Sequence, residues 1–417
     1  MKKTILFLII VYQFSTLDCE AQNVGIGTST PMARLHVADS SVVFTATGII
    51  PVTPGNPPVS GAGRRMMWYA DKAAFRVGYV AGTAWNKANV GDYSFAAGIE
   101  TEASGSASVS MGSYTIASGH NSFATGFGAT ASGEYSFAMG SSTATGNFSA
   151  ALGLSTANGP YSTAMGNNSI ARGYGSTVVG VDNNPILNSP EQIVTPTTPL
   201  FIIGNGDGAI GRSNAMVVLK NGNIGISTSA PVVRLHVNGN SSSGNPEILV
   251  EENEDDYARL SFKTTAHPAK YWDIAAITKA TSTGAELNFF YGGVGNVFSL
   301  KATGDATLSG TLTQSSDERL KKNITPMSNS LIHLMKINGY TYNWKDAYKD
   351  QSTQIGVLAQ EVQKIFPELV KEDSKGLLTV NYSGLIPVVI TAIREQQNQI
   401  QVLKEQMEEL RKLINKR

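Results

Sequence analysis

Ten residues at the start of the last quarter of the chain gather one serine pair, two carboxylates and three cations. They read Ser315-Ser-Asp-Glu-Arg-Leu-Lys-Lys-Asn-Ile324. A serine hydroxyl becomes a good nucleophile when a neighbouring base takes its proton, and a lysine can be that base only when it is neutral. Burial against apolar groups, or a nearby cation, lowers the pKa of a lysine enough for this role. A Ser-Asp pair ahead of basic residues is equally typical of a helix N-cap, so these residues alone leave both alternatives open.

Other titratable residues in the chain form no convincing chemical cluster. His36 and His236 lie within alternating strand patterns, without the Cys, His or Asp neighbours that a metal site needs. The acidic run 251–256 lacks the spacing and central glycine of an EF-hand, so we expect a solvated turn there. His333 lies among apolar residues, where a core or surface helix position is expected. We therefore predict no metal site and no cofactor.

The last 32 residues, 386–417, predict a coiled coil. Apolar residues recur every seven positions in two seams, and Glu and Lys fill the flanks. Gln396 is a polar residue in one seam, where it could set the register. The alternative is a lone amphipathic helix packed on its own domain. The apolar seam positions are Ile386, Ile393, Ile400, Met407 and Ile414, and Val389, Leu403 and Leu410.

Residues 91–180 carry a repeat of 13 or 14 residues with two series of glycines in step. Fourteen residues suffice for two strands of about five residues and two tight turns, and Gly supplies the positive φ that such turns need. Alternation places the repeated alanines on one face and the Ser, Phe and Met positions on the other. One series is Gly98, Gly112, Gly126, Gly140, Gly153, Gly166 and Gly180, the other is Gly91, Gly105, Gly119, Gly133, Gly146, Gly159 and Gly173, and the alanines include Ala96, Ala124, Ala138 and Ala164.

A single coil of this kind buries too little apolar surface to fold alone. We therefore expect the coils to stack, with a rise of about 4.8 Å each, and three chains to pack side by side. The alternative is an inert Gly/Ser-rich tract of low complexity.

The units Ser122-Phe-Ala-Thr-Gly126 and Ser136-Phe-Ala-Met-Gly140 resemble the head repeat of YadA-like trimeric autotransporter adhesins. The resemblance covers about 90 residues. It implies a left-handed parallel β-roll, trimerisation and a surface-binding or spacing role.

The remaining segments predict further β-structure. Residues 23–37 and 223–237 are near copies, 200 positions apart, and each predicts two short strands around a Pro-containing turn. A small β element is expected around 66–86. A compact β module is expected at 240–312, with strands at 247–250, 258–262, 271–276, 286–291 and 297–300.

The N-terminus indicates a secreted chain, and the charge balance narrows the classes of partner. Residues 1–21 combine two lysines, a short apolar run and small residues before a cut after Ala21, as in a signal peptide. A lipidated Cys19 is the alternative, against which Asp18 stands. Cleavage after Ala21 leaves no cysteine, and hence no disulfide. Lys+Arg and Asp+Glu both number 32, which argues against nucleic-acid binding. No later segment is apolar enough to cross a membrane.

Three motifs follow one another in the C-terminal part: Ser316-Asp-Glu-Arg-Leu-Lys-Lys-Asn-Ile324, Ile355-Gly-Val-Leu-Ala-Gln-Glu-Val362 and Val380-Asn-Tyr-Ser-Gly-Leu-Ile-Pro387. This segment resembles the intramolecular chaperone domain of phage endosialidases and tail spikes, a self-cleaving Ser/Lys peptidase family. The resemblance implies a domain that assembles three chains, aids folding of the upstream fibre and is then cut off. It implies cleavage of the Ser316–Asp317 bond, with Ser316 as nucleophile and Lys321 as base.

The geometry of that cleavage leaves two routes open. Attack by Ser316 on its own carbonyl would need a strained four-membered ring. Ser316 of one chain could instead act on a neighbouring chain, once folding has placed the groups in range. Attack on the preceding carbonyl, an N-to-O shift, would cut before Ser316.

The sequence thus predicts a mostly β chain with left-handed parallel β-roll repeats, a β module and a small α+β domain that ends in a trimeric coiled coil. The predicted order is a signal peptide (1–21), an N-terminal β repeat and connector (22–90), head repeats (91–180), a connector with the second near copy (181–239), the β module (240–312), the chaperone domain (313–385) and the coiled coil (386–417).

The predicted function is that of a secreted homotrimeric, adhesin-like fibre on a bacterial cell surface, which binds itself and a host or cell-surface glycan or protein. Its single-turnover peptidase would act on its own chain. The alternative is a glycan-binding fibre with an uncleaved C-terminal trimer clamp.

Overall fold

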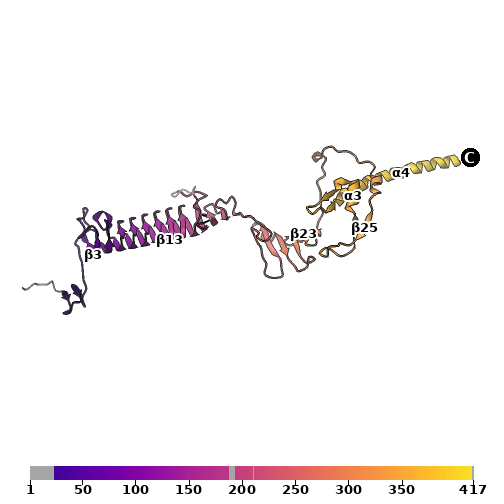
Figure 1. Cartoon of the computed structure of the whole chain (residues 1–417). Coiled ribbons are helices and arrows are strands. Elements are labelled where there is room, and N and C mark those ends of the chain that lie inside the picture. Colours follow the sequence, from indigo (N-terminus) through magenta and orange to yellow (C-terminus); the bar gives the residue numbers. More distant parts are fainter. Residues whose placement is uncertain (1–22, 187–192, 210, 416–417) are drawn as a thin grey trace, which may run out of the picture. The chain divides into compact units, whose positions relative to one another are not determined.

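The computed structural model describes residues 23–186, 193–209 and 211–415 (Figure 1). The chain divides into two compact units, 1–247 and 248–417. The predicted signal peptide, residues 1–21, lies outside the described residues. Within them, no helix has the length and apolar character required to cross a membrane.

A solenoid of stacked β-coils dominates the first unit and confirms the parallel repeats (Figure 1). In most coils a strand of four or five residues is followed by one of two residues, which is shorter than expected because a turn follows directly after its inward-facing alanine. The strands are β5 (Phe95–Ile99), β6 (Glu102–Ala103), β7 (Val109–Ser113), β8 (Ile116–Ala117), β9 (Phe123–Phe127), β10 (Thr130–Ala131), β11 (Phe137–Gly140), β12 (Thr143–Ala144), β13 (Ala150–Ala157), β14 (Thr163–Ala171) and β15 (Thr177–Val181).

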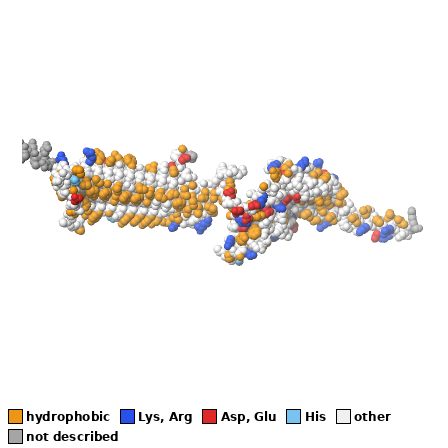
Figure 2. Space-filling model, turned by 90° about the horizontal axis from the view of Figure 1, so that it is seen from below, with side chains coloured by type: hydrophobic (Ala, Val, Ile, Leu, Met, Phe, Trp, Pro, Cys, Tyr) orange, Lys and Arg blue, Asp and Glu red, His pale blue; other side chains and the backbone are white. Residues whose placement is uncertain are grey.

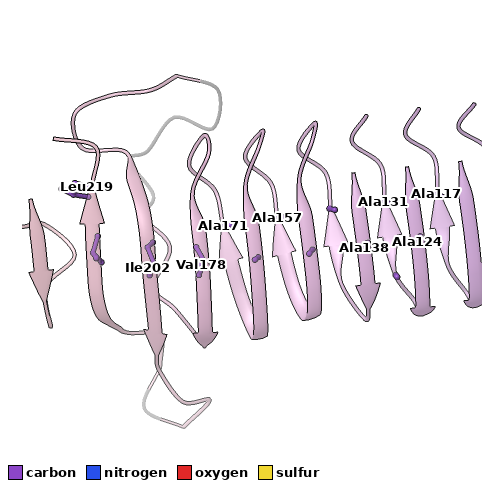
Figure 3. Close-up of a cluster of buried hydrophobic side chains, with 14 residues drawn as sticks. Ala117, Ala124, Ala131, Ala138, Ala157, Ala171, Val178, Ile202 and Leu219 are labelled. Carbon is purple, nitrogen blue, oxygen red and sulfur yellow. The ribbon is translucent and has the colours of Figure 1, made fainter. Parts of the chain in front are cut away.

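Two rows of alanines form the core of the solenoid (Figure 3). One row runs in register through Ala124, Ala138 and Ala151, and the other through Ala117 and Ala131. All of these side chains are fully buried. The thin core therefore has no room for larger residues until the last coils, where Val178 and Ile202 take the place of alanine.

The repeated serines correct one sequence expectation, because they point inward. Ser122 lies two residues before Ala124, so alternation places both on the same face. Its hydroxyl donates to the carbonyl oxygen of Gly119 at 2.7 Å, and Ser136 donates to Gly133 in the same way at 2.6 Å. Each buried hydroxyl thus satisfies the carbonyl at a corner of its own coil.

The two glycine series serve different purposes. Gly98 and its counterparts have positive φ, 130° at Gly98 and 124° at Gly166, as expected. The other series is required for space: a Cβ on Gly119 would lie 2.0 Å from the carbonyl oxygen of Gly133 in the next coil. The positive φ at the adjoining turns belongs instead to residues such as Tyr135, whose φ is 56°.

A β-hairpin covers the first coil, in agreement with the expected β element. Its strands are β3 (Gly63–Tyr69) and β4 (Ala74–Val80). The short helix η1 (Ala70–Lys72) connects them, and a second short helix, η2 (Lys87–Asn89), follows β4 in the chain. β4 pairs in parallel with β5 and places Arg76 opposite Ala96. Arg76 is 0% exposed and donates to Ser94 O, Ser94 Oγ and Ala103 O at 2.8–3.0 Å. The guanidinium therefore closes the end of the alanine core, and burial lowers its pKa to about 10.

The two near copies fold alike, as their sequences predict. β1 (Val24–Ile26) pairs in parallel with β2 (Leu35–Val37), and β18 (Ile224–Ile226) pairs with β19 (Leu235–Val237) in the same register. The second copy follows β16 (Pro199–Asn205) and β17 (Asn214–Leu219), which continue the solenoid sheet. His36 and His236 lie at equivalent positions of β2 and β19. Among the described residues, no group of three or more His, Cys, Asp or Glu side chains could hold a metal ion.

The second unit begins with an antiparallel five-stranded sheet. Its strands are β20 (Ala258–Lys263), β21 (Tyr271–Ile277), β22 (Glu286–Tyr291), β23 (Gly295–Lys301) and β24 (Ala306–Leu308). Four of the predicted strands are confirmed, whereas 247–250 is not a strand. The acidic run 251–256 is exposed, and its Asp256 forms an ion pair with Arg259.

The C-terminal domain of this unit is small and mixed α+β, as predicted. A core of Val362, Phe366 and Val388 joins its helices. The elements are η3 (Glu318–Leu320), α2 (Ser330–Leu334), β25 (Gly339–Tyr342), β26 (Gln354–Val357), α3 (Ala359–Ile365), η4 (Pro367–Leu369), β27 (Val370–Glu372), β28 (Leu378–Val380), η5 (Tyr382–Gly384) and the long helix α4 (Leu385–Ile414).

Candidate autoprocessing site

The segment 315–324, which contains Ser316 and Lys321, folds around a single helical turn, η3. Asp317 is its N-cap, and the Asp317 carboxylate accepts a hydrogen bond from the Arg319 backbone N–H at 2.9 Å. The Arg319 guanidinium pairs with the same carboxylate at 2.6 Å. This side-chain hydrogen bond holds the pKa of Asp317 below its usual value. The local pattern is therefore a helix start, with Asp317 rather than Ser316 as the cap.

The same turn brings Ser316 and Lys321 together. The Lys321 Nζ donates to the Ser316 Oγ at 2.7 Å. Five residues separate the two in sequence, and the capped turn between them returns the chain so that the side chains meet. The contact is short enough for direct proton transfer from the hydroxyl to a neutral lysine amine. A cap and a Ser–Lys pair therefore coexist in one motif.

Both members of the pair are exposed in the single chain, as are Arg319 and Lys322. A lysine acts as a base at neutral pH when burial or a nearby cation removes its proton. Burial is absent here, and the guanidinium of Arg319 is engaged by Asp317. The described chain thus holds Ser316 and Lys321 within hydrogen-bond distance but leaves the lysine in water.

Other residues considered in the sequence have structural positions. His333 lies on α2, and its ring contacts the edge of Phe366, with centroids 5.9 Å apart. His333 is half-buried there, in agreement with the core or surface helix position expected for it. Glu318 lies within η3 and is exposed.

The second and third motifs support the domain rather than the reacting pair. Gly356 leaves room for Tyr382, whose hydroxyl oxygen accepts from the Val357 N–H at 3.1 Å; a Cβ on Gly356 would lie 2.6 Å from that oxygen. Glu361 accepts from the Tyr340 hydroxyl at 2.6 Å. This hydrogen bond lowers the pKa of Glu361 and raises that of Tyr340.

One supporting residue had no signal in the sequence. Glu395, on α4, accepts hydrogen bonds from the backbone N–H groups of Ser330 and Leu331, at 3.1 and 2.8 Å. It thereby caps α2 from another helix, and the positive end of α2 favours its charge. In the sequence Glu395 looks like one more flank charge of the coiled coil, because only the tertiary fold brings α2 beside it.

Fold and site together define a class: a β-solenoid chain with a chaperone-type C-terminal segment that holds a Ser–Lys pair. Residues 316–371 match the family model described as chaperone of endosialidase. Residues 117–143 and 157–183 match two copies of the YadA head domain repeat. These matches confirm both resemblances seen in the sequence.

Similar proteins include phage tail fibres. The long tail fiber protein Gp37 of Escherichia phage AR1 is 44% identical over 87 residues, which cover 19% of this chain and 8% of the relative. That of Salmonella phage S16 is 33% identical over 119 residues, or 27% of this chain and 16% of the relative. That of Enterobacteria phage M1 is 32% identical over 96 residues, or 21% of this chain and 38% of the relative. The chain therefore matches less than half of the length of each.

Proposed function

We propose that this chain is a secreted homotrimeric fibre of a bacterial cell surface, and that its C-terminal domain is a trimerisation chaperone which cuts itself off between Ser316 and Asp317. The observation that carries the proposal is the 2.7 Å contact between Lys321 Nζ and Ser316 Oγ, inside the segment that matches the chaperone of endosialidase. Lys321 would take the hydroxyl proton, and Ser316 Oγ would attack a peptide carbonyl to form an ester. The C–N bond would break, the amine of the following residue would leave with that proton, and water would then hydrolyse the ester. The predicted domain boundaries form part of this proposal.

Exposed apolar side chains support self-association. Figure 2 shows them in rows along the repeat region. Met111, Met139 and Met165 face outward from alternate long strands, β7, β11 and β14, and are exposed in the single chain. On α4, both predicted seams are exposed as well, including Ile393, Ile400 and Leu403. Three chains would cover these surfaces, whereas one chain leaves them in water.

Assembly would also supply the missing burial at the site. A neighbouring chain that covers Lys321 would remove its amine from water, and it would offer a peptide bond that Ser316 can attack without a strained ring. Cleavage would then follow assembly rather than precede it.

The test is intact-mass analysis of the full chain beside three variants. We expect the wild type to split, whereas Ser316→Ala and Lys321→Ala stay whole. Lys322→Ala is the matched control, because the hydrogen bond to Ser316 comes from Lys321 and not from this neighbouring lysine, and it should split like the wild type. A released fragment that begins at Asp317 supports attack between chains, and one that begins at Ser316 supports the N-to-O shift.

An uncleaved trimer clamp is the second candidate, and the exposure of Lys321 favours it. In that case the wild type remains whole and trimeric, and the peptidase proposal fails. A host or cell-surface glycan or protein is the proposed ligand of the fibre in either case.

A further inference from the structure

The five-stranded sheet, β20–β24, has two faces of opposite character. On one face the register aligns Phe262, Trp272 and Tyr291, and this face also carries exposed Leu260, Phe289 and Leu300. On the other face it aligns Ser261 with Asp273 and Ala275 with Asn288. The apolar face fits contact with further protein, and the polar face is the one that could meet a small hydrophilic ligand.

A cavity of about 250 Å³ opens on the polar face. Pockets for drug-sized ligands hold roughly 300–1,000 Å³, so this one suits a single sugar-sized ring. Its lining combines aromatic and polar side chains: Tyr257, Tyr271 and Phe290, with Arg259, Asp273, Asn288 and Asn296.

Two buried acceptors line this cavity. The Asn288 side chain is 1% exposed, and its Oδ1 has no hydrogen-bond donor among the described residues. Asp273 is 5% exposed, and its Oδ1 accepts from the Ser261 Oγ at 2.6 Å. A buried acceptor without a donor is costly, and native proteins rarely retain one without a reason. The cavity therefore calls for a ligand that donates hydrogen bonds.

A hydrogen-bond network fixes the orientation of these acceptors in advance. The Asn288 Nδ2 donates to Glu286 Oε1 at 3.0 Å, which turns Oδ1 away from Glu286. The Tyr257 hydroxyl donates to the same carboxylate. Arg259 is held by Asp256 at 2.9 Å and by the Tyr257 carbonyl at 2.7 Å. The pocket is thus preorganised without a ligand.

We propose that this cavity binds one ring of a neutral saccharide. Sugar hydroxyls would donate to Asn288 Oδ1 and to the Asp273 carboxylate, and Arg259 would donate to a ring or hydroxyl oxygen. The apolar C–H face of the sugar would pack on the aromatic walls formed by Tyr271 and Phe290. An acidic sugar fits less well, because its carboxylate would meet that of Asp273 in a partly desolvated site.

This inference does not depend on self-cleavage. All lining residues lie before Ser316, so the cavity stays with the fibre whether or not the C-terminal domain is released. Intact-mass and binding measurements on the same sample therefore separate the failure of one proposal from the failure of the other.

The test uses the full chain and methyl glycosides of glucose, galactose, mannose and N-acetylglucosamine, with methyl glucuronide as the acidic probe. Binding is detected by saturation-transfer NMR and measured by calorimetry. We expect at least one neutral glycoside to bind. Asp273→Asn and Phe290→Ala should each weaken it by about tenfold or more, in line with the loss of one good polar or stacking contact.

Ser299→Ala is the matched control, since Ser299 lies opposite Asn288 on the same face but outside the cavity. It should bind like the wild type. If thermal unfolding shows that Phe290→Ala fails to fold, Phe290→Leu replaces it, because leucine keeps an apolar side chain at this position but lacks the aromatic ring. Binding of the glucuronide alone, no binding of any neutral glycoside, or equal binding by the cavity variants would overturn the proposal.

Discussion

At the scale of single residues, the solenoid depends on positions where only hydrogen fits. Gly119 is a clear case, because the atom that a Cβ would strike, the Gly133 carbonyl oxygen at 2.0 Å, already accepts hydrogen bonds from the backbone and side chain of Ser136. The clash could be relieved only if the two coils moved apart. Overpacking of a tight core costs about 1–3 kcal/mol, and here the clash is with backbone rather than with a side chain that can turn.

We therefore expect Gly119→Ala to lower the free energy of unfolding of the head repeats by about 1–3 kcal/mol. Chemical denaturation of the full chain, followed by circular dichroism, measures it. Gly82→Ala is the control, because nothing lies within 4 Å of a Cβ at Gly82. Equal stability of both variants would show that coil spacing does not depend on this glycine.

Residue-level prediction from the sequence succeeded where alternation alone decides the outcome. Ala124 and Ala138 are buried as expected, since each lies mid-strand on the inner face. The same rule, applied to Ser122, would have placed that serine inside too. The expectation of outward-facing serines was wrong because it gave the polarity of the serine side chain more weight than its position in the strand. Ser122 is inside because its hydroxyl finds a corner carbonyl, a partner that appears only once the coil has closed.

At the scale of elements, α4 has two roles along its length. Its first turns pack into the domain through Val388 and Ala392, which are buried, and through Glu395. The seams beyond that point remain exposed in the single chain. Helices gain most of their stability from packing, so the exposed seams of the second half are compatible with the proposed coiled coil.

We expect Ile400→Asp to disrupt self-association, since it removes a seam side chain worth about 1.5–3 kcal/mol of burial in every chain and places like charges together. Sedimentation velocity should show a loss of the trimer. Asn398→Asp introduces the same residue outside the two seams and should leave the assembly intact. If both variants remain trimeric, α4 is a lone helix and the trimer contact lies elsewhere.

The stability of the β-sheet module should depend on pH through Glu286. Hydrogen bonds from Tyr257 and then Asn288, with Lys301 on the neighbouring strand, lower the pKa of this carboxyl. A lowered folded-state pKa contributes stability above the unfolded value, near 4.3, and that contribution disappears as the pH falls through the folded value. Acidification should therefore weaken the network that orients Asn288.

Thermal unfolding between pH 7 and pH 3 tests this dependence. The wild type should lose stability below about pH 4.3, whereas Glu286→Gln should start lower at pH 7 and vary less. Glu251→Gln removes an exposed carboxylate of the same module and should keep the wild-type profile. A wild-type slope in Glu286→Gln would assign the pH dependence to other groups.

Element-level prediction was sound wherever a pattern repeated or a strand alternated clearly. β20–β23 were predicted within a few residues because aromatic and β-branched residues alternate between turns. Residues 247–250 share that apolar character, yet they pair with nothing in the described chain. Composition cannot distinguish the two cases, because a strand exists only where a neighbour accepts its hydrogen bonds. The Ser316–Lys321 contact was likewise implied by a family resemblance rather than by spacing.

At the scale of the whole molecule, the C-terminal domain follows a solenoid that is difficult to fold, and its proposed chaperone role addresses that difficulty. Parallel coils pair residues that are separated by a turn of the solenoid, and in the proposed trimer three chains would have to do so in the same register. Such non-local pairing is slow and exposes strand edges meanwhile. A C-terminal domain that first joins three chains would raise their local concentration and align them. Once the solenoid has formed, the paired backbone holds itself and the chaperone is dispensable.

We therefore expect the uncleaved chain and the cleaved fibre to differ in how well they refold. Uncleaved Ser316→Ala protein, unfolded in guanidinium and diluted, should regain its trimer, whereas wild-type fibre that has lost the C-terminal domain should aggregate instead. Both should resist unfolding equally before treatment, because they share the same solenoid. Light scattering and sedimentation after dilution report the two outcomes. If the cleaved fibre refolds as well as the uncleaved one, the domain is not needed for folding, and the trimer contacts of the solenoid suffice to align the chains.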